Sequence, residues 1–282
     1  MYDKNFLKIC FENVQQKNPL VHCITNFVTV NDCANIVLAV GGQPTMAKHP
    51  GETAQVAARA AALVLNMGTV SEIDAMLNAG RSANEHGRPI ILDPVGVASS
   101  DLRKKLIGEM SRAMRFSIIR GNASEIRYMA TGIGGGAGVD ASLEDRITSA
   151  NAASFGALAR SLAQSLGCVV SISGVIDIVA DSCHAYAVHG GCYEMSRITG
   201  SGCMLTALMG AFAGANPDCI TEAAITAQAV MNVSGELAKL KTDAAGGGTM
   251  TFRMHLIDMV SLMTPEILEE HARVEELQLC DI

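Results

Sequence analysis

Short apolar runs recur along the chain and predict a buried, mainly parallel sheet. Six runs are rich in β-branched residues and end in glycine, proline or a small polar residue: 61–69, 88–96, 116–124, 168–174, 175–181 and 184–190. Segments with helical spacing of apolar residues lie between most of them. Near-continuous apolar strands that alternate with helices indicate an α/β fold, in which the sheet carries helices on both faces.

The segment between the second and third runs, "SSDLRKKLIGEMSRAMR", has the clearest helical spacing. Apolar residues recur there every four positions, with one more beside them: Leu102, Leu106, Ile107, Met110 and Met114. This spacing predicts an amphipathic helix with a single apolar face.

Two further segments refine the prediction. The last two runs are joined at Asp181 and Ser182, which predicts a hairpin and therefore an antiparallel edge of the sheet. From Gly202 onward the spacing is mainly helical, with a flexible interruption, "AAGGGTM", at 244–250. The following "HLIDMVSLMTPEILEEHARVEEL" resumes the helical pattern.

Composition narrows the class of protein. Of the 282 residues, 49% are apolar, but no apolar run approaches the roughly 20 residues that a membrane helix needs. The net charge is −7 and no basic block is longer than "RKK", which argues against a nucleic-acid partner. No linker divides the chain, so we expect one domain over residues 1–282 with a small-molecule partner and no membrane association.

The N-terminus and the cysteines predict a cytoplasmic location. The first twenty residues alternate charged and apolar side chains, unlike a secretory signal. The nine cysteines are scattered singly, without a C-x-x-C pair. Neither a disulfide framework nor a structural zinc site is therefore expected.

Polar residues end three of the predicted strands. Asp93 ends the second, Arg120 and Glu125 belong to "RGNASE" at the end of the third, and Ser173 ends the fourth. Ligands bind beyond the carboxyl ends of parallel strands, so these side chains should meet at one edge. Two carboxylates and a guanidinium suit an anionic ligand with Mg²⁺. Each also has a structural interpretation, as a turn or capping residue or as a surface charge.

The segment "ITGSGCMLTALMGAFAG", residues 198–214, adds a possible anion site. "TGSG" can wrap backbone N–H groups around a phosphate at the positive end of the helix that begins near Cys203. A tight turn against the sheet is the alternative. Leu205 replaces the third glycine of a dinucleotide fingerprint, and the chain has no Gly-Lys pair of a Walker A loop. The residues alone predict an α/β enzyme that handles a phosphorylated ligand.

Several motifs resemble those of the hydroxyethylthiazole kinase family. "VHCITN" and "PTMA" lie within residues 19–52, and "ILDPVGV", "IIRGNASEI", "SISGVIDIVAD" and "ITGSGCMLTALMGAF" follow in the family's order, over roughly residues 18–265. The resemblance implies a three-layer, ribokinase-like α/β fold with a mainly parallel central sheet and helices on both faces. It implies phosphorylation of the alcohol of 4-methyl-5-(2-hydroxyethyl)thiazole with ATP and Mg²⁺, in thiamine biosynthesis or salvage. It also implies a homotrimer with active sites at subunit interfaces.

The resemblance assigns roles to individual residues. Met46, Gly200 and Asn26 would bind the thiazole, Arg120, Ser173 and Gly202 would bind ATP, Asp93 and Glu125 would organise Mg²⁺, and Cys203 would be catalytic. Ser173 and Ser201 stand where the family commonly has threonine, which preserves the hydroxyl. Near the C-terminus "GGGTMTFR" replaces the usual P-G-x-F-R and is expected to reshape a loop near the nucleotide.

Cys203 stands where ribokinase-like kinases generally place an aspartate base. A helix N-terminus is expected to lower the pKa of this thiol from about 8.5 towards neutrality, so that it can accept the proton of the substrate alcohol. A thiolate is still a modest base, so Cys203 should assist catalysis rather than be indispensable. The structural alternative for Cys203, and for Met46, is an apolar residue that fills space in the core. His22 is expected to be a hydrogen-bonded structural residue.

Other function classes stay open. A hydroxymethylpyrimidine or pyridoxal kinase, or a nicotinamide-hydrate dehydratase of related fold, would be expected to carry aspartate in place of Cys203. A thiol hydrolase would need a histidine partner for Cys203, and His184 and His189 are available without supporting spacing. A non-catalytic regulator that binds thiazole or nucleotide would not need the whole set of charged residues.

Overall fold

All strands of the described chain belong to one sheet. The computed structural model describes residues 5–133 and 146–279. The strands are β1 (Leu20–Ile24), β2 (Gln43–Thr45), β3 (Ala62–Asn66), β4 (Ile90–Asp93), β5 (Ile118–Asn122), β6 (Val169–Ser173), β7 (Ile176–Ala180), β8 (Ala185–His189) and β9 (Arg273–Glu276). They lie in the order β2-β1-β3-β4-β5-β6-β7-β8-β9. Neighbours from β2 to β6 are parallel, and those from β6 to β9 are antiparallel.

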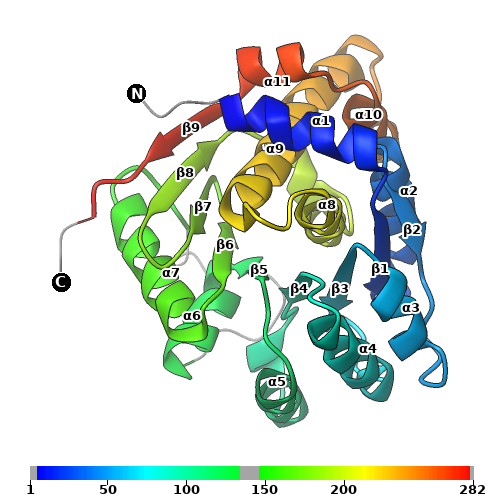
Figure 1. Ribbon diagram of the computed structural model, residues 1–282. Coiled ribbons are helices and arrows are strands. Elements are labelled where there is room, and N and C mark those ends of the chain that lie inside the picture. The colour runs from blue at the N-terminus through cyan, green and yellow to red at the C-terminus, as the bar shows by residue number, and fades with distance from the viewer. Residues whose placement is uncertain (1–4, 134–145, 280–282) are drawn as a thin grey trace.

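Helices cover both faces of this sheet (Figure 1). One face carries α1 (Asn5–Lys17), α2 (Val30–Ala39), α8 (Ser201–Ala215), α9 (Ile220–Ala244), α10 (Thr249–Ser261) and α11 (Pro265–His271). The other carries α3 (Thr53–Arg59), α4 (Ile73–Glu85), α5 (Asp101–Ala113), α6 (Ala123–Thr131) and α7 (Ala152–Leu166). The short 3-10 helices η1 (Val97–Ser99) and η3 (Tyr193–Arg197) lie between these elements. The predicted three-layer α/β arrangement is thereby confirmed.

The central strands are apolar over most of their length because alternate side chains enter two different cores. In β3, Leu63 and Leu65 belong to the core shared with α4 and α5, whereas Val64 belongs to the core shared with α8 and α9. α8 approaches the sheet closely at Gly210, where a Cβ atom would lie 2.5 Å from Val64 Cγ2. This contact helps to fix α8 above the central strands.

The predicted strands and hairpin are confirmed. Each of the six runs contains one strand, from β3 to β8. β7 and β8 pair antiparallel across a turn in which Asp181 N donates to His184 O. The helix predicted between the second and third runs is α5, and the interruption at 244–250 separates α9 from α10.

Two predictions are wrong. Residues 273–276, assigned to a helix, form β9 because their backbone pairs with the open edge of β8, which outweighs local helical spacing in so short a segment. Leu102 does not belong to the apolar face of α5 and is 53% exposed. It lies in the first turn, whereas the buried residues of this helix begin one turn later at Leu106.

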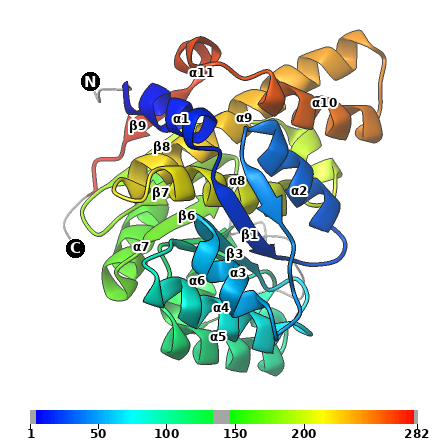
Figure 2. The same cartoon turned by 45° about the vertical axis from the view of Figure 1, so that its right-hand side comes forward.

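The first and last described elements lie side by side (Figure 2). α1 packs against α11, and β9 extends the sheet beside β8. α10 packs against α2. The Arg253 guanidinium on α10 forms an ion pair with the buried carboxylate of Asp32 on α2. Helices of the C-terminal third of the chain therefore pack against helices of the N-terminal third.

No helix in the two described ranges has both the length and the apolar character required to cross a membrane. The eight described cysteines are free thiols.

Candidate active site

One cavity gathers most of the residues predicted to form the site. It has a volume of about 560 Å³ and lies where the carboxyl ends of the central strands meet the N-terminus of α8. Seven of the predicted residues line it: Asn26, Asp93, Arg120, Glu125, Gly200, Gly202 and Cys203. Ser173 does not line the cavity but contacts Arg120, and Met46 is not among the lining residues.

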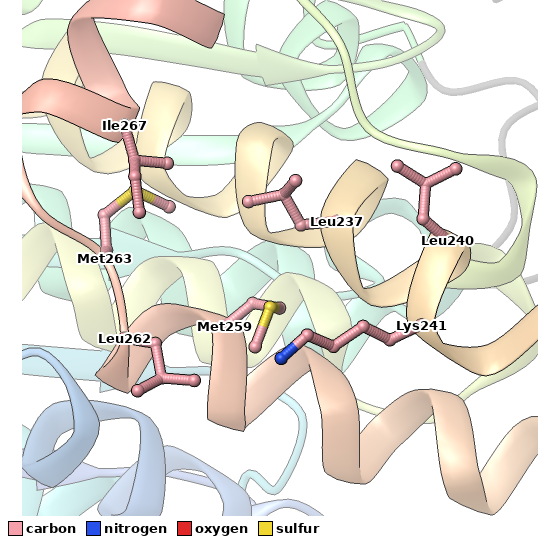
Figure 3. Close-up of a pocket in the computed structure, with 7 residues that line it drawn as sticks. All are labelled: Leu237, Leu240, Lys241, Met259, Leu262, Met263 and Ile267. Atoms are coloured by element: carbon pink, nitrogen blue, oxygen red, sulfur yellow. The ribbon is translucent and has the colours of Figure 1, made fainter. Parts of the chain in front are cut away.

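A second cavity offers no comparable chemistry. It has a volume of about 340 Å³ and lies between α9, α10 and α11 (Figure 3). Its lining residues are Leu237, Leu240, Lys241, Met259, Leu262, Met263 and Ile267. Because this lining contains one cation and no carboxylate, the cavity at the strand ends is the candidate active site.

The glycine loop forms the turn that its sequence predicts. Gly200 has φ of +86° and is the N-cap of α8, a conformation that glycine adopts without strain. A Cβ atom there would lie 2.6 Å from Thr29 Cγ2. The first intrahelical hydrogen bond runs from Met204 N to Gly200 O. The N–H groups of the first turn, at Ser201 to Cys203, have no acceptor within the helix and belong to residues that line the cavity.

Arg120 is held between three parts of the site. Its Nε and Nη2 donate to Ser173 Oγ at 3.1 and 2.6 Å. Its Nη1 lies 3.6 Å from Asp93 Oδ2. On the side of the glycine loop, a Cβ atom at Gly202 would lie 2.6 Å from Nη1. The guanidinium therefore presents a fixed positive charge to the cavity.

Asp93 supplies a buried carboxylate in which only one oxygen has described hydrogen-bond partners. Its Oδ2 accepts hydrogen bonds from Asn66 Nδ2 at 3.0 Å and Thr206 Oγ1 at 2.8 Å. Its buried Oδ1 has no hydrogen-bond partner among the described residues. Burial raises the pKa of Asp93, and the charge of Arg120 opposes this effect. An unpaired carboxylate oxygen at a cavity wall is a suitable ligand for a hard cation.

Glu125 caps the helix that follows β5, as its structural interpretation predicts. Its Oε2 accepts from the backbone N of Asn122 and its Oε1 from the backbone N of Gly96, both at 2.8 Å. Asn122 in turn caps α6, which completes a capping box. Burial and the nearby Asp93 raise the pKa of Glu125 to about 7. The carboxyl group of Glu125 therefore loses its proton less readily than that of an exposed glutamate.

The expectation that the helix N-terminus lowers the pKa of Cys203 is wrong. Burial raises this pKa, and the nearby carboxylate of Asp93 raises it further. The Sγ atom accepts hydrogen bonds from Asn66 Nδ2 at 3.2 Å and Asn26 Nδ2 at 3.4 Å, which only partly offset the loss of water. At neutral pH Cys203 is therefore predominantly a thiol.

Asn66 is a site residue that the sequence analysis missed. Its Nδ2 donates to both Asp93 and Cys203, and its Oδ1 accepts from Asn26 Nδ2 at 3.1 Å and Gly68 N at 2.9 Å. It connects the carboxylate to the thiol, and it is 1% exposed. The signal was present in "AALVLNMGT", where Asn66 is the polar residue at the end of an apolar run.

The predicted thiazole contact Met46 lies beyond β2, at the edge of the sheet. Its side chain is partly buried and packs against the core that contains α2 and α8. The next residue is anchored, because Ala47 O is 2.7 Å from His22 Nε2. His22 is fully buried on β1, so its predicted structural role is confirmed.

The pH dependence of the free energy of unfolding should contain a contribution from the buried His22. Burial lowers its pKa from 6.5, so below that pH the unfolded chain takes up a proton that the folded chain does not. Stability that is fully present above pH 6.5 should be lost as the pH falls from 6.5 towards the lower pKa of the folded state. Urea unfolding at pH 7.5 and 5.5 measures the change in unfolding free energy, and the difference between wild type and His22→Gln gives the contribution of His22, because carboxyl groups with raised pKa values such as Glu125 act in the opposite direction in both proteins. The exposed His184→Gln should leave this change unaltered; an equal change in wild type and His22→Gln would contradict the assignment.

Comparison with known proteins decides the family. The model of the hydroxyethylthiazole kinase family matches residues 11–266. The chain belongs to this family. It is 43% identical over 277 residues to the hydroxyethylthiazole kinase of Desulfovibrio desulfuricans, covering 95% of this chain and 97% of that protein. The corresponding protein of Clostridium acetobutylicum is 41% identical over 271 residues, covering 95% and 99%.

Superposition on solved structures agrees with this family assignment. The hydroxyethylthiazole kinase of Pyrococcus horikoshii OT3 superposes with a TM-score of 0.84 at 28% identity, covering 97% of this chain and 100% of that chain. A ribokinase-like protein of Enterococcus faecalis gives a TM-score of 0.61 at 10% identity, covering 95% of each chain. The fold is therefore ribokinase-like, as the sequence motifs imply.

Proposed function

We propose that the protein transfers the γ-phosphoryl group of ATP to the alcohol of 4-methyl-5-(2-hydroxyethyl)thiazole, in thiamine biosynthesis or salvage. Its membership of the hydroxyethylthiazole kinase family supports this reaction. The single structural observation that carries it is the meeting of Asp93, Arg120 and Cys203 with the N-terminus of α8 in one cavity. That set can bind a triphosphate, a cation and an alcohol side by side.

The phosphates of ATP would lie between Arg120 and the first turn of α8. Phosphoryl transfer depends mainly on alignment and on neutralising negative charge. Arg120, held by Ser173, supplies a positive charge, and the N–H groups from Ser201 to Cys203 supply donors at the positive end of a helix. Each such donor can contribute about 3 kcal/mol to stabilising the transition state. Gly202 contributes by lacking a side chain that would displace Arg120.

Asp93 and Glu125 fit a magnesium ion. The described residues contain no group of three or more His, Cys, Asp and Glu side chains arranged to hold a metal ion. Mg²⁺ commonly binds through one or two carboxylates, with phosphates and water completing its shell. The unpaired Oδ1 of Asp93 suits a direct ligand, whereas both Glu125 oxygens already accept backbone N–H groups and suit a contact through water. When bound, the ion would neutralise charge on the transferring phosphoryl group.

The thiazole would bind at Asn26, Gly200 and Cys203, in a site completed by a neighbouring subunit. Phe27 and Val28 directly follow Asn26 and are 78% and 55% exposed, and the exposed Tyr193 lies on η3 near the cavity. Large exposed apolar side chains beside a cavity are typical of an interaction surface. We propose that three chains pack through this surface and that Met46, which does not line the cavity of its own chain, serves that of a neighbour.

A charge introduced at this surface should prevent assembly of the trimer. Phe27→Asp should convert the trimer to a monomer and raise KM for the thiazole, because a buried unpaired carboxylate opposes association. Light scattering should give three times 29.5 kDa for the wild type and 29.5 kDa for the variant. Leu166→Asp changes a 41% exposed leucine on the distant α7 and should stay trimeric. A monomeric wild type with full activity would contradict the proposal.

Cys203 would orient the alcohol, and only its minor thiolate form could accept the alcohol proton late in the reaction. Its raised pKa leaves little thiolate at neutral pH, and its sulfur already accepts two amide donors. A largely dissociative transition state makes little demand for early deprotonation. The thiol therefore assists a reaction whose rate depends mainly on the charged groups.

Loss of this thiol should be tolerated. Cys203→Ala should lower kcat by about tenfold, which is less than general acid–base catalysis typically contributes, because the thiol only assists. Cys183→Ala, at an exposed turn, should have no effect. Steady-state ADP release measures both variants. Abolished turnover in folded Cys203→Ala would make the thiol indispensable and overturn the assisting role.

The proposed reaction is tested directly by ADP release from the purified protein with ATP and Mg²⁺. Hydroxyethylthiazole should stimulate this release, and hydroxymethylpyrimidine or pyridoxal should not. Stimulation by one of those alcohols instead would keep the fold and discard the substrate. ATP-independent turnover sensitive to iodoacetamide would favour a thiol hydrolase.

A further inference from the structure

A buried carboxylate lies behind the candidate active site, and none of the steps proposed above uses it. Asp177 lies on β7 and is 5% exposed. It occupies the strand face that packs on α9, where its neighbour Val179 belongs to the apolar core. An apolar side chain would avoid the desolvation of a charge at this position. The presence of a carboxylate therefore needs an explanation other than packing.

Three N–H groups converge on this carboxylate. Its Oδ1 accepts from the backbone N of Gly174 at 2.9 Å, and its Oδ2 accepts from Gln228 Nε2 at 3.0 Å and Asn232 Nδ2 at 2.8 Å. Burial raises the pKa of Asp177 to about 6, against the opposing hydrogen bonds from Gly174 and Asn232 and the charge of Arg120. At neutral pH the group is therefore mainly ionised. Hydrogen bonds to both carboxylate oxygens favour the ionised form.

Gly174 connects this network to the candidate active site. The turn between β6 and β7 contains only Gly174 and Val175, so an anchor on Gly174 also fixes the preceding Ser173. The turn is tight, because a Cβ atom at Gly174 would lie 3.0 Å from Ile176 O. Ser173 Oγ is the atom that accepts both hydrogen bonds from Arg120.

Arg120 has little freedom to adjust if this turn moves. Its Nη1 faces Asp93 Oδ2 at 3.6 Å on one side. On another, Gly202 approaches so closely that an added Cβ atom would lie 2.6 Å from Nη1. A shift of a few tenths of an ångström at Ser173 would therefore change how the guanidinium meets a ligand.

We propose that Asp177 is a positioning residue for nucleotide binding, which holds the turn between β6 and β7 so that Ser173 fixes Arg120 against the phosphates of a nucleoside triphosphate. Gln228 and Asn232 on α9 hold the carboxylate in place. Asp177 is not among the residues that line the cavity and acts through Ser173 and Arg120. The inference rests on the proposed function, since it takes Arg120 and Ser173 as nucleotide contacts.

Asp177→Asn tests the inference with little change in size. An asparagine offers one carbonyl oxygen to three N–H donors, so at least one hydrogen bond is lost. KM for ATP should rise about tenfold, the equivalent of one lost hydrogen bond to a charged group, while KM for hydroxyethylthiazole stays within about twofold. An equal rise in both KM values, or an unchanged KM for ATP in a folded variant, would overturn the inference.

Asp181→Asn is the matched control. Asp181 closes the turn at the other end of β7, where its Oδ1 accepts from the backbone N of Cys183 and His184, both at 2.8 Å. Its Oδ2 accepts from Thr221 Oγ1. The same substitution in the same hairpin should leave KM for ATP unchanged. A similar rise in Asp181→Asn would show that loosening the hairpin alone explains the effect.

Gln228→Leu and a binding measurement keep the test informative if Asp177→Asn does not fold. Gln228→Leu removes one donor on Oδ2 and leaves the Gly174 bond intact. Calorimetric titration with ADP should show affinity weakened about threefold by Gln228→Leu and about tenfold by Asp177→Asn. Unchanged ADP affinity in both variants would contradict the inference. If the wild type binds ADP but shows no thiazole-dependent turnover, the proposed function fails while the Asp177 test still stands.

Discussion

Asp93→Asn should lower kcat by about 10³-fold while the protein stays folded. The fold should survive because the asparagine oxygen can take the place of Oδ2, which accepts from Asn66 and Thr206. Its amide would then occupy the position of Oδ1, which has no hydrogen-bond partner among the described residues. Activity should be lost because Asp93 lines the cavity, and its unpartnered carboxylate oxygen becomes a neutral donor, which repels a cation.

The dependence of rate on Mg²⁺ measures this effect. Asp93→Asn should require much higher Mg²⁺ for half-maximal activity, with a lower plateau. Asp101→Asn removes the same charge from a fully exposed side chain on α5 and should change neither quantity. If Asp93→Asn kept the wild-type Mg²⁺ dependence, Asp93 would not belong to the metal site.

Gly202→Ala should lower kcat/KM for ATP by up to about 10²-fold, the kinetic equivalent of the 1–3 kcal/mol that overpacking costs. The added Cβ atom would lie 2.6 Å from Arg120 Nη1 and 3.0 Å from Nη2. Arg120 cannot move aside freely, since Ser173 and Asp93 hold it. Alanine favours helix more than glycine does, so thermal stability should change little. The loss should therefore appear in nucleotide use rather than in folding.

Gly108→Ala provides the comparison for this variant. Gly108 lies in the middle of α5, where an added Cβ atom would come no closer than 3.5 Å, to Arg112 Nη1. This variant should be fully active and slightly more stable. Wild-type kcat/KM for ATP in Gly202→Ala would show that Arg120 does not contact the nucleotide from its observed position.

The strands and most of the site could be predicted from sequence because their signals are local. The first part of a run such as 61–69 is apolar because the strand is buried on both faces, so its position can be predicted without knowledge of its neighbours. Residues that end such strands, including Asp93 and Arg120, share one edge by the topology of a parallel sheet. The glycine loop was visible because Gly200 needs a positive φ that few other residues adopt.

Other features followed only from contacts between distant parts of the chain. β9 exists because β8, at residues 185–189, offers an open edge to this distant segment, whereas the local spacing of 273–276 favours helix. Asn66 acquires its role by meeting Cys203, 137 residues away. Asp177 could be placed in a strand from sequence, but its three donors come from a turn and from α9.

The sequence by itself thus determined the strand positions, the glycine loop and the set of charged residues at the strand ends, since each depends on neighbours in the chain. The tertiary structure decided the protonation and the partners of those residues. Cys203 shows the difference: its place at a helix start predicts a lowered pKa, but burial and Asp93 raise it. Desolvation and long-range charge depend on which side chains the fold brings together, and spacing along the chain does not encode them.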